Sequence, residues 1–194
     1  VTYNDEEPPH PKAYAQAMAE KMVGRENLKL ILEPGRAIAA NAGILVTEVE
    51  FIKEGEEKSF AIVDAAMNDL VRPTLYNAHH AIVPVNEAPD GAKLTEVEVV
   101  GPICETGDTF GRQFLPEPGE GDLLAIRTAG AYGAVMASAY NTRALVPEVM
   151  VNGADASVIR DRISVDDMLS RESLPDWLSD DEEVRGQEQK EAGD

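Results

Sequence analysis

The most regular pattern in this chain is Gly43-Ile-Leu-Val-Thr-Glu-Val-Glu-Phe-Ile-Lys53, whose side chains alternate with a period of two. A period of two places alternate side chains on opposite faces of a β-strand. One face would carry Leu45, Thr47, Val49 and Phe51. The other, more polar face would carry Val46, Glu48, Glu50 and Ile52. We therefore predict a strand over residues 43–53.

Further short segments of this kind follow, separated by turn residues such as those at 54–57. They lie at residues 59–64, 81–85, 95–100, 122–127 and 147–151. Short strands at such spacing are typical of antiparallel barrels and sandwiches. The chain is therefore predicted to be mainly β, with an antiparallel β-barrel or sandwich as its principal domain. Only the small, apolar residues 131–141 could be helical instead.

The sequence before this domain favours a helix followed by a strand rather than a series of strands. Residues 12–23 are rich in Ala, Met, Glu and Lys, which favour a helix, and Gly24 suits its end. Residues 28–32, Leu-Lys-Leu-Ile-Leu, predict a short buried strand. A helix and a buried strand form a unit of an α/β architecture, but about 36 residues cannot build a core alone. Because the chain begins at Val1 rather than Met, we expect a piece of a longer protein.

The sequence after the predicted strands contains one pattern that favours a helix, followed by an acidic C-terminal segment. Ser164 stands where the N-cap of a short helix is expected, within residues 161–178. Residues 179–194 are strongly acidic and nearly without apolar side chains. Such a segment cannot bury enough surface to offset its conformational entropy, so we predict a disordered tail.

Composition narrows the classes of function. The 194 residues include 36 Asp and Glu against 17 Lys and Arg, a net charge of −19. Because phosphate contacts need clustered basic side chains, nucleic-acid binding is excluded and attachment to anionic lipid is disfavoured. No apolar run has the length of a membrane helix. The single cysteine, Cys104, excludes a disulfide framework and a multi-cysteine metal site. We expect a soluble, cytoplasmic protein.

Two segments carry arginines in positions suited to anions. In Glu-Pro-Gly-Arg at 33–36, Gly35 allows close backbone approach to a phosphate or carboxylate, and Arg36 offers a bidentate fork. Arg72 and Tyr76 lie four residues apart after a proline-fixed turn, and together they suit a substrate carboxylate. The alternatives are an ordinary surface turn, a surface ion pair and a half-buried tyrosine.

Two further segments contain candidate reactive groups. Cys104 and Glu105 place a thiol beside a carboxylate in a turn, where they could form an acid/base pair, although a lone cysteine is usually an inert apolar residue. Tyr132 is framed by glycines and alanines, so its ring can lie against a flat partner or in the core. The adjacent His79 and His80 are not expected to hold a metal, because neighbouring residues rarely ligate one ion.

In this order and at these separations, four phrases resemble the diaminopimelate decarboxylases, which share a fold group with alanine racemase and other pyridoxal-phosphate decarboxylases. The phrases are Glu-Pro-Gly-Arg (33–36), Arg-Pro-Thr-Leu-Tyr-Asn-Ala-His-His (72–80), Gly-Pro-Ile-Cys-Glu-Thr-Gly-Asp (101–108) and Gly-Ala-Tyr-Gly (130–133). The opening residues resemble the text that follows the glycine-rich phosphate loop of that family, and the resemblance extends to about residue 178.

The resemblance implies the C-terminal portion of an enzyme that converts meso-diaminopimelate to L-lysine and carbon dioxide, the last step of lysine biosynthesis. Residues 1–36 would be the end of a (β/α)8 barrel that binds the cofactor, pyridoxal 5′-phosphate. Residues 37–160 would be the β domain that completes the active site and the dimer interface. Residues 161–178 would be a short helix, followed by the tail at 179–194.

The same resemblance implies which residues contact the cofactor and which contact the substrate. At the cofactor it places Glu33, Pro34, Gly35, Arg36 and Tyr132. Arg36 and Tyr132 would also reach the substrate, whose non-reacting carboxylate Arg72 and Tyr76 would bind.

It further implies that two residues act across a dimer. Glu105 would hold the distal ammonium, and Cys104 would protonate the carbon that loses carbon dioxide. In the family this pair enters the active site of the neighbouring subunit, so the enzyme would be a homodimer with shared sites.

In the family, three parts of the active site lie N-terminal to the region that this sequence resembles. They are the lysine that binds the cofactor covalently, the glycine-rich loop and a histidine over the cofactor ring. Lys21 and Lys29 stand in the wrong motifs to replace that lysine. The isolated chain is therefore expected to be inactive.

Two alternative functions remain open. One is a related decarboxylase of arginine, ornithine or carboxynorspermidine, and Arg36, Arg72 and Glu105 together favour diaminopimelate over these. The other is a β domain that binds a decarboxylase subunit without chemistry, against which the retained Cys104 weighs.

Overall fold

A computed structural model of the chain describes residues 1–3 and 6–178, so the predicted tail at 179–194 lies outside the described residues. The strands are β1 (Leu45–Lys53), β2 (Ser59–Val63), β3 (Ile82–Pro84), β4 (Leu94–Val100), β5 (Thr109–Pro116), β6 (Leu123–Ile126), β7 (Glu148–Asn152) and β8 (Asp155–Arg160). The α-helices are α1 (Pro11–Met22), α2 (Arg36–Ala39), α3 (Arg72–Tyr76) and α4 (Val165–Leu169). Short 3-10 helices are η1 (Ala40–Ala42), η2 (Ala134–Met136), η3 (Tyr140–Thr142) and η4 (Asp176–Leu178).

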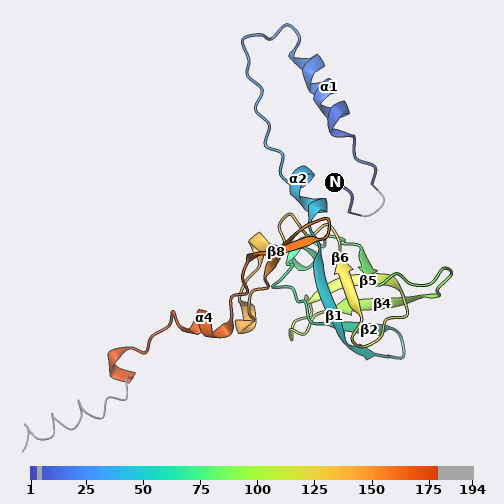
Figure 1. Cartoon of the computed structure of the whole chain (residues 1–194), viewed down its shortest axis with the longest axis vertical. Helices are drawn as coiled ribbons and strands as arrows, with labels where there is room; N and C mark the ends of the chain where they lie inside the picture. The colour runs from blue at the N-terminus through green and yellow to red at the C-terminus, as the bar shows by residue number, and fades with distance from the viewer. Residues whose placement is uncertain (4–5, 179–194) are drawn as a thin grey trace, which may run out of the picture.

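Six strands form one curled sheet in the order β3-β6-β1-β2-β4-β5 (Figure 1). Its two edge strands come together, since Gln113 of β5 donates a hydrogen bond to the carbonyl of His80, just before β3. The sheet is thus a nearly closed barrel, which confirms the predicted mainly-β fold class. Its one parallel pair, β2 with β4, departs from an antiparallel meander because α3 and β3 lie in the long connection between these strands.

The inner face of β1 follows the predicted alternation only as far as a β-bulge. Thr47 and Val49 are buried, whereas Phe51 is 51% exposed. The pairing of β1 with β2 shifts register between Val49 and Phe51, and Ile52 packs against the core in place of Phe51. A bulge inserts one residue and so exchanges the faces of the residues that follow it.

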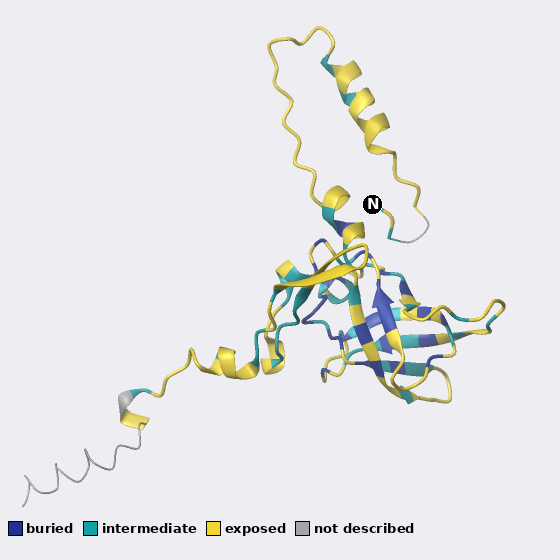
Figure 2. Cartoon of the chain, viewed as in Figure 1, coloured by how far each residue is buried: buried dark blue, intermediate teal, exposed yellow. Residues whose placement is uncertain are grey.

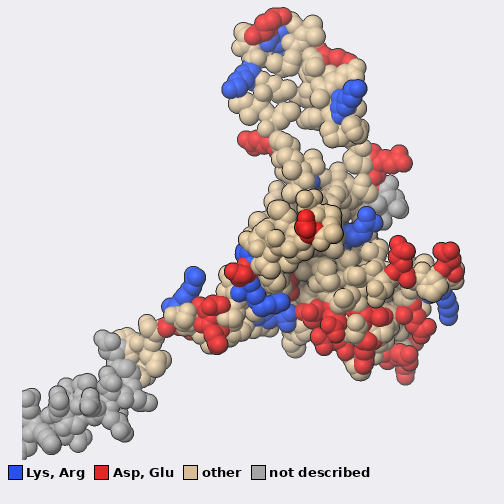
Figure 3. Space-filling model, in the orientation of Figure 1, with Lys and Arg blue, Asp and Glu red and all other residues tan. Residues whose placement is uncertain are grey.

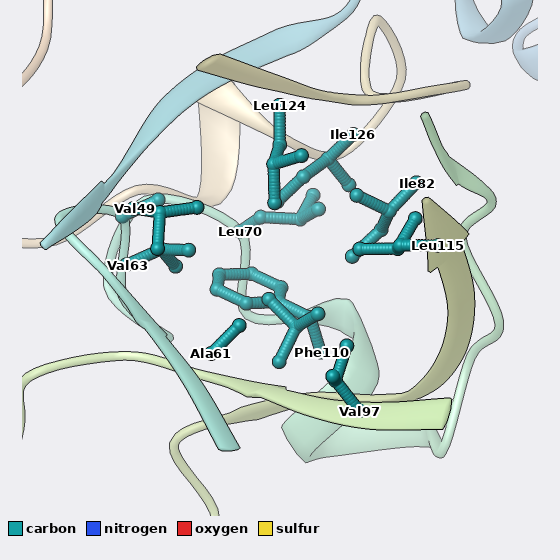
Figure 4. Close-up of a cluster of buried hydrophobic side chains, with 12 residues drawn as sticks. Val49, Ala61, Val63, Leu70, Ile82, Val97, Phe110, Leu115, Leu124 and Ile126 are labelled. Carbon is teal, nitrogen blue, oxygen red and sulfur yellow. The ribbon is translucent and has the colours of Figure 1, made fainter. Parts of the chain in front are cut away.

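Twelve buried apolar side chains fill the barrel (Figure 4). Leu70, from the loop before α3, and Phe110, from β5, lie between the two sides of the barrel in this view. The sequence did not predict β5, because Gly111 and Pro116 are unfavourable in strands. Its alternation nevertheless buries Phe110 and Leu115.

The predicted helix at 12–23 forms as α1, but the predicted strand at 28–32 does not form. Residues 28–32 have no regular structure and are exposed, with Ile31 at 71%. Figure 1 shows α1 and this segment standing away from the barrel, and Figure 2 colours them mostly as exposed. The physical reason is that, among the residues described, no strand pairs with this segment to satisfy its backbone groups.

The remaining predictions concern residues 131–169. Residues 131–141 form no α-helix but the single turns η2 and η3, and Asn141 has a left-handed backbone, φ 56°, that ends any helical run. The predicted strand at 147–151 forms as β7, whose hairpin partner β8 was not predicted. Ser164 caps α4 as predicted, in a capping box with Asp167. No helix in the described ranges has the length and hydropathy to cross a membrane.

Candidate functional site

An open pocket of about 240 Å³ lies where α2, α3 and the loop after β6 meet. It is lined by Arg36, Arg72, Tyr76, Tyr132 and Met136. Four of these five residues come from three segments that the sequence analysis singled out separately. The fold therefore brings together the predicted anion-binding arginines and the two predicted tyrosines, and adds Met136, which the sequence analysis did not single out.

Helix α3 presents two of the lining residues on one face. Arg72 and Tyr76 are four residues apart, the spacing that stacks side chains on a helix. Pro73 suits the first turn, and Asn77 ends the helix in a left-handed conformation, φ 54°. Arg72 is only 8% exposed and Tyr76 is 61% exposed, so the guanidinium lies deep in the pocket and the phenol at its rim.

A close backbone contact sets Tyr132 against α2. The N–H of Gly130 donates to the carbonyl of Ala40, 3.1 Å away, and a Cβ on Gly130 would collide with the carbonyl of Ala39. Tyr132 itself has a left-handed backbone, φ 60°. As a result, its hydroxyl lies 3.9 Å from the point that a Cβ on Gly35 would occupy. This contact accounts for the two segments meeting at one pocket.

The two arginines of the pocket form no ion pair with any acidic side chain of residues 1–3 and 6–178. Acidic side chains instead gather over the part of the barrel that holds the β1–β2 turn, away from α2 (Figures 1 and 3). A buried cation without an anion is costly, which applies above all to Arg72. The pocket is therefore suited to bind an anionic ligand.

Two residues that the sequence analysis did not assign to the site contact Arg72. The Nη1 atom of Arg72 lies 3.1 Å from Nε2 of His80, and its guanidinium carbon lies 4.7 Å from the centre of the Tyr3 ring. His80 is fully buried, and this burial lowers its pKa. The hydrogen bond to the Arg127 carbonyl opposes the shift, and the charge of Arg72 adds to it. No sequence signal separated His80 from His79 or gave weight to Tyr3.

The predicted reactive pair lies elsewhere. Cys104 and Glu105 are exposed, in the loop between β4 and β5, and do not line the pocket of their own chain. The Tyr140 hydroxyl donates to Oε1 of Glu105 at 2.7 Å, and this hydrogen bond raises the pKa of Tyr140. The loop is tied to α3, because the Thr74 hydroxyl donates to the carbonyl of Gly107 at 2.6 Å.

Asp108 holds the loop of Cys104 in place. Its carboxylate is buried and accepts the N–H groups of Met67, at 2.6 Å, and Ile103, at 2.7 Å. Burial raises the pKa of the Asp108 carboxyl, and the two N–H donors oppose that shift. One side chain thus connects the Cys104 loop to the segment that follows β2.

Replacing Asp108 by alanine is expected to lower the free energy of unfolding by about 2–4 kcal/mol, because two backbone N–H groups lose their acceptor. Urea denaturation of the chain measures this loss. Asp90→Ala, at an exposed position of the β3–β4 loop, is the matched control and should leave the midpoint unchanged. Equal midpoints for the two variants would contradict the role of Asp108.

The donor set at α2 fits a phosphate-bearing cofactor. The Arg36 guanidinium and the Tyr132 hydroxyl are both donors, and no acid of the described segments lines the pocket. Gly35 leaves the space beside the hydroxyl free of a side chain. Glu33 and Pro34 are exposed, precede α2 and do not line the pocket. The described lining contains no lysine, so these residues could not bind a cofactor aldehyde covalently.

Comparison with known proteins agrees with these observations. The sequence profile described as "Pyridoxal-dependent decarboxylase, C-terminal sheet domain" matches residues 5–130. Diaminopimelate decarboxylase of Neisseria meningitidis serogroup B is 54% identical over 172 residues, covering 89% of this chain and 41% of the relative. That of Vibrio cholerae is 49% identical over 174 residues, covering 90% and 41%.

A solved structure of similar fold is diaminopimelate decarboxylase from Helicobacter pylori complexed with L-lysine. It has a TM-score of 0.80 and 41% identity, and the match covers 88% of this chain and 42% of that one. The chain thus spans about two fifths of the length of the relatives it matches. The match of the family profile to most of the barrel and to the arginine-bearing segments shows that this chain belongs to the C-terminal sheet domains of the pyridoxal-dependent decarboxylases.

Proposed function

We propose that this chain is the C-terminal part of a pyridoxal-phosphate-dependent diaminopimelate decarboxylase, which converts meso-diaminopimelate to L-lysine and carbon dioxide. The observation that carries the proposal is the convergence on one pocket of two tyrosines and two arginines, neither of which pairs with an acid among the described residues. The names of the relatives at about 50% identity support the same substrate.

In this proposal Arg72 and Tyr76 bind the carboxylate at the non-reacting end of the substrate. Charge-assisted hydrogen bonds contribute about 1.5–3 kcal/mol each, so this pair distinguishes diaminopimelate from amino acids that lack a distal carboxylate. Lysine with its only carboxylate at the reacting end would leave Arg72 without a distal anion, so these contacts explain why lysine is not itself a substrate. Ornithine and arginine likewise have no second carboxylate for Arg72 to bind.

The cofactor would be held by residues 33–36 together with Tyr132, with the Arg36 and Tyr132 donors at its phosphate. When bound, pyridoxal phosphate supplies the electron sink for the loss of carbon dioxide. The covalent lysine would lie in a preceding (β/α)8 barrel, of which residues 1–36 would be the end. For this reason we propose that the chain by itself is inactive.

Cys104 and Glu105 would act in the pocket of a neighbouring subunit, in a cytoplasmic homodimer whose sites are shared. Their exposure outside their own chain's pocket supports this arrangement. Cys104 Sγ would donate a proton to the carbon that loses carbon dioxide, and Glu105 would bind the distal ammonium. A homodimer also places both copies of this loop symmetrically.

The test is a carbon dioxide release assay on the complete natural protein that contains this chain, with pyridoxal phosphate. We expect turnover of meso-diaminopimelate and none of ornithine, arginine or carboxynorspermidine. Turnover of one of those amines instead would support the related decarboxylases. No turnover of any of the four, with binding to a separate decarboxylase subunit, would support the non-catalytic alternative.

A further inference from the structure

The first three residues are fixed on the pocket by contacts with distant parts of the chain. The carbonyl of Thr2 accepts hydrogen bonds from Asn41 Nδ2, at 3.1 Å, and from the Thr128 hydroxyl, at 3.2 Å. The Tyr3 ring then lies 4.7 Å from the Arg72 guanidinium carbon and 5.8 Å from that of Arg36. Both distances are within the range of cation–π attraction. One ring thus contacts both arginines of the pocket.

His80 approaches Arg72 from another direction, with a defined tautomer. Its Nδ1 atom lies 2.9 Å from the carbonyl oxygen of Arg127, which can only accept, so Nδ1 carries the proton. Nε2 is then the acceptor for Arg72 Nη1 at 3.1 Å. The ring of Tyr3 packs at 5.5 Å and 84° to the His80 ring, so the two supports contact each other.

We infer that Tyr3 and His80 are positioning residues that hold the Arg72 guanidinium for the distal carboxylate of the substrate. Among the described residues, His80 is the only hydrogen-bond partner of the Arg72 side chain. One donor is used to orient the group and the others stay available for a bidentate contact. The inference rests on the proposed function of Arg72 and adds the residues that pre-organise it.

The support requires a neutral His80. The charged or titratable groups near its ring are Arg72, His79 and Tyr3, and burial lowers its pKa below the usual 6.5. Protonation would place a second cation beside Arg72 and remove the acceptor at Nε2. We therefore expect the KM for meso-diaminopimelate to be unaffected near pH 6.5 and to rise only at lower pH, as the pH falls through the lowered pKa of His80.

Kinetics of the complete enzyme test the inference. His80→Leu, which removes the acceptor, is expected to raise KM for meso-diaminopimelate about tenfold or more, the effect of losing a hydrogen bond to a charged group, with a much smaller change in kcat. His80→Gln keeps an acceptor and cannot titrate, so it should retain most of the affinity and lose the rise of KM at low pH. Unchanged KM in His80→Leu, or a low-pH rise that persists in His80→Gln, would overturn the inference.

Tyr3 provides a second test that does not disturb the core. Tyr3→Leu should raise KM several-fold, and Tyr3→Phe should restore it, because the hydroxyl has no hydrogen-bond partner in the part of the chain described. Tyr14→Leu, at an exposed position of α1, is the matched control and should have no effect. Equal KM values for Tyr3→Leu and Tyr14→Leu would contradict the role of Tyr3.

A measurement without substrate separates this inference from the proposed function. In ¹⁵N-histidine NMR spectra of the chain, His80 should be protonated at Nδ1 and unprotonated at Nε2 at neutral pH. The opposite tautomer would overturn the contact with Arg72 whatever the enzyme's activity. Unchanged kinetics in Arg72→Ala, with the expected tautomer present, would instead count against the proposed substrate.

Discussion

Arg72→Ala is expected to lower kcat/KM for meso-diaminopimelate by about 10²–10⁴-fold in the complete enzyme, mainly through KM. Two charge-assisted hydrogen bonds of about 1.5–3 kcal/mol each are lost. Each loss of about 1.4 kcal/mol lowers kcat/KM tenfold. The effect is large because Arg72 is nearly buried and has no acid partner in the described chain that could take over the role of the ligand.

Two further variants show whether the loss comes from the binding geometry. Arg72→Lys keeps the charge but not the planar fork, so it should recover only part of the affinity. Arg112→Ala is the control, since Arg112 is an exposed arginine of β5 paired with Glu96 at 3.2 Å. Its kinetics should match those of the unmodified enzyme. An equal loss in Arg72→Ala and Arg112→Ala would contradict specific carboxylate binding.

Cys104→Ala is expected to lower kcat by about 10²–10⁴-fold while changing KM little, because it removes a proton donor rather than a binding group. The side chain is exposed and the loop is held by Asp108, so the fold should not change. Steady-state kinetics together with a urea midpoint measure the two properties separately. A normal kcat would contradict the proposed proton transfer.

The shared site can be tested by mixing two inactive variants. A dimer of one Cys104→Ala subunit and one Arg72→Ala subunit contains one site with neither substitution and one site with both. Random association of the two variants should therefore restore about a quarter of the unmodified activity, as two-fold symmetry requires. At substrate concentrations well below the KM of Arg72→Ala, each variant alone should have little activity. If mixed subunits recover no activity, Cys104 does not act in the neighbouring pocket.

Local patterns predicted much of the fold. The period-two stretch at 43–53, the helix at 12–23 and the cap at Ser164 all depend on short-range physics, and all three form. The bulge after Val49 was not predictable, because it depends on how β2 pairs with β1. The apolar residues 28–32 show the same limit, since a strand exists only where a neighbour satisfies its backbone.

For the candidate site, too, some features followed from the sequence and others only from the tertiary structure. The sequence by itself determined which residue types are available: two arginines, two tyrosines, and a cysteine next to a glutamate. Only the tertiary structure decided that Arg36, Arg72, Tyr76 and Tyr132 share one pocket while Cys104 lies outside it. It also decided that Tyr3 and His80 support Arg72. The physical reason is that chemical type belongs to each residue alone, whereas proximity comes from contacts such as Gly130 against α2 that join segments far apart in the chain.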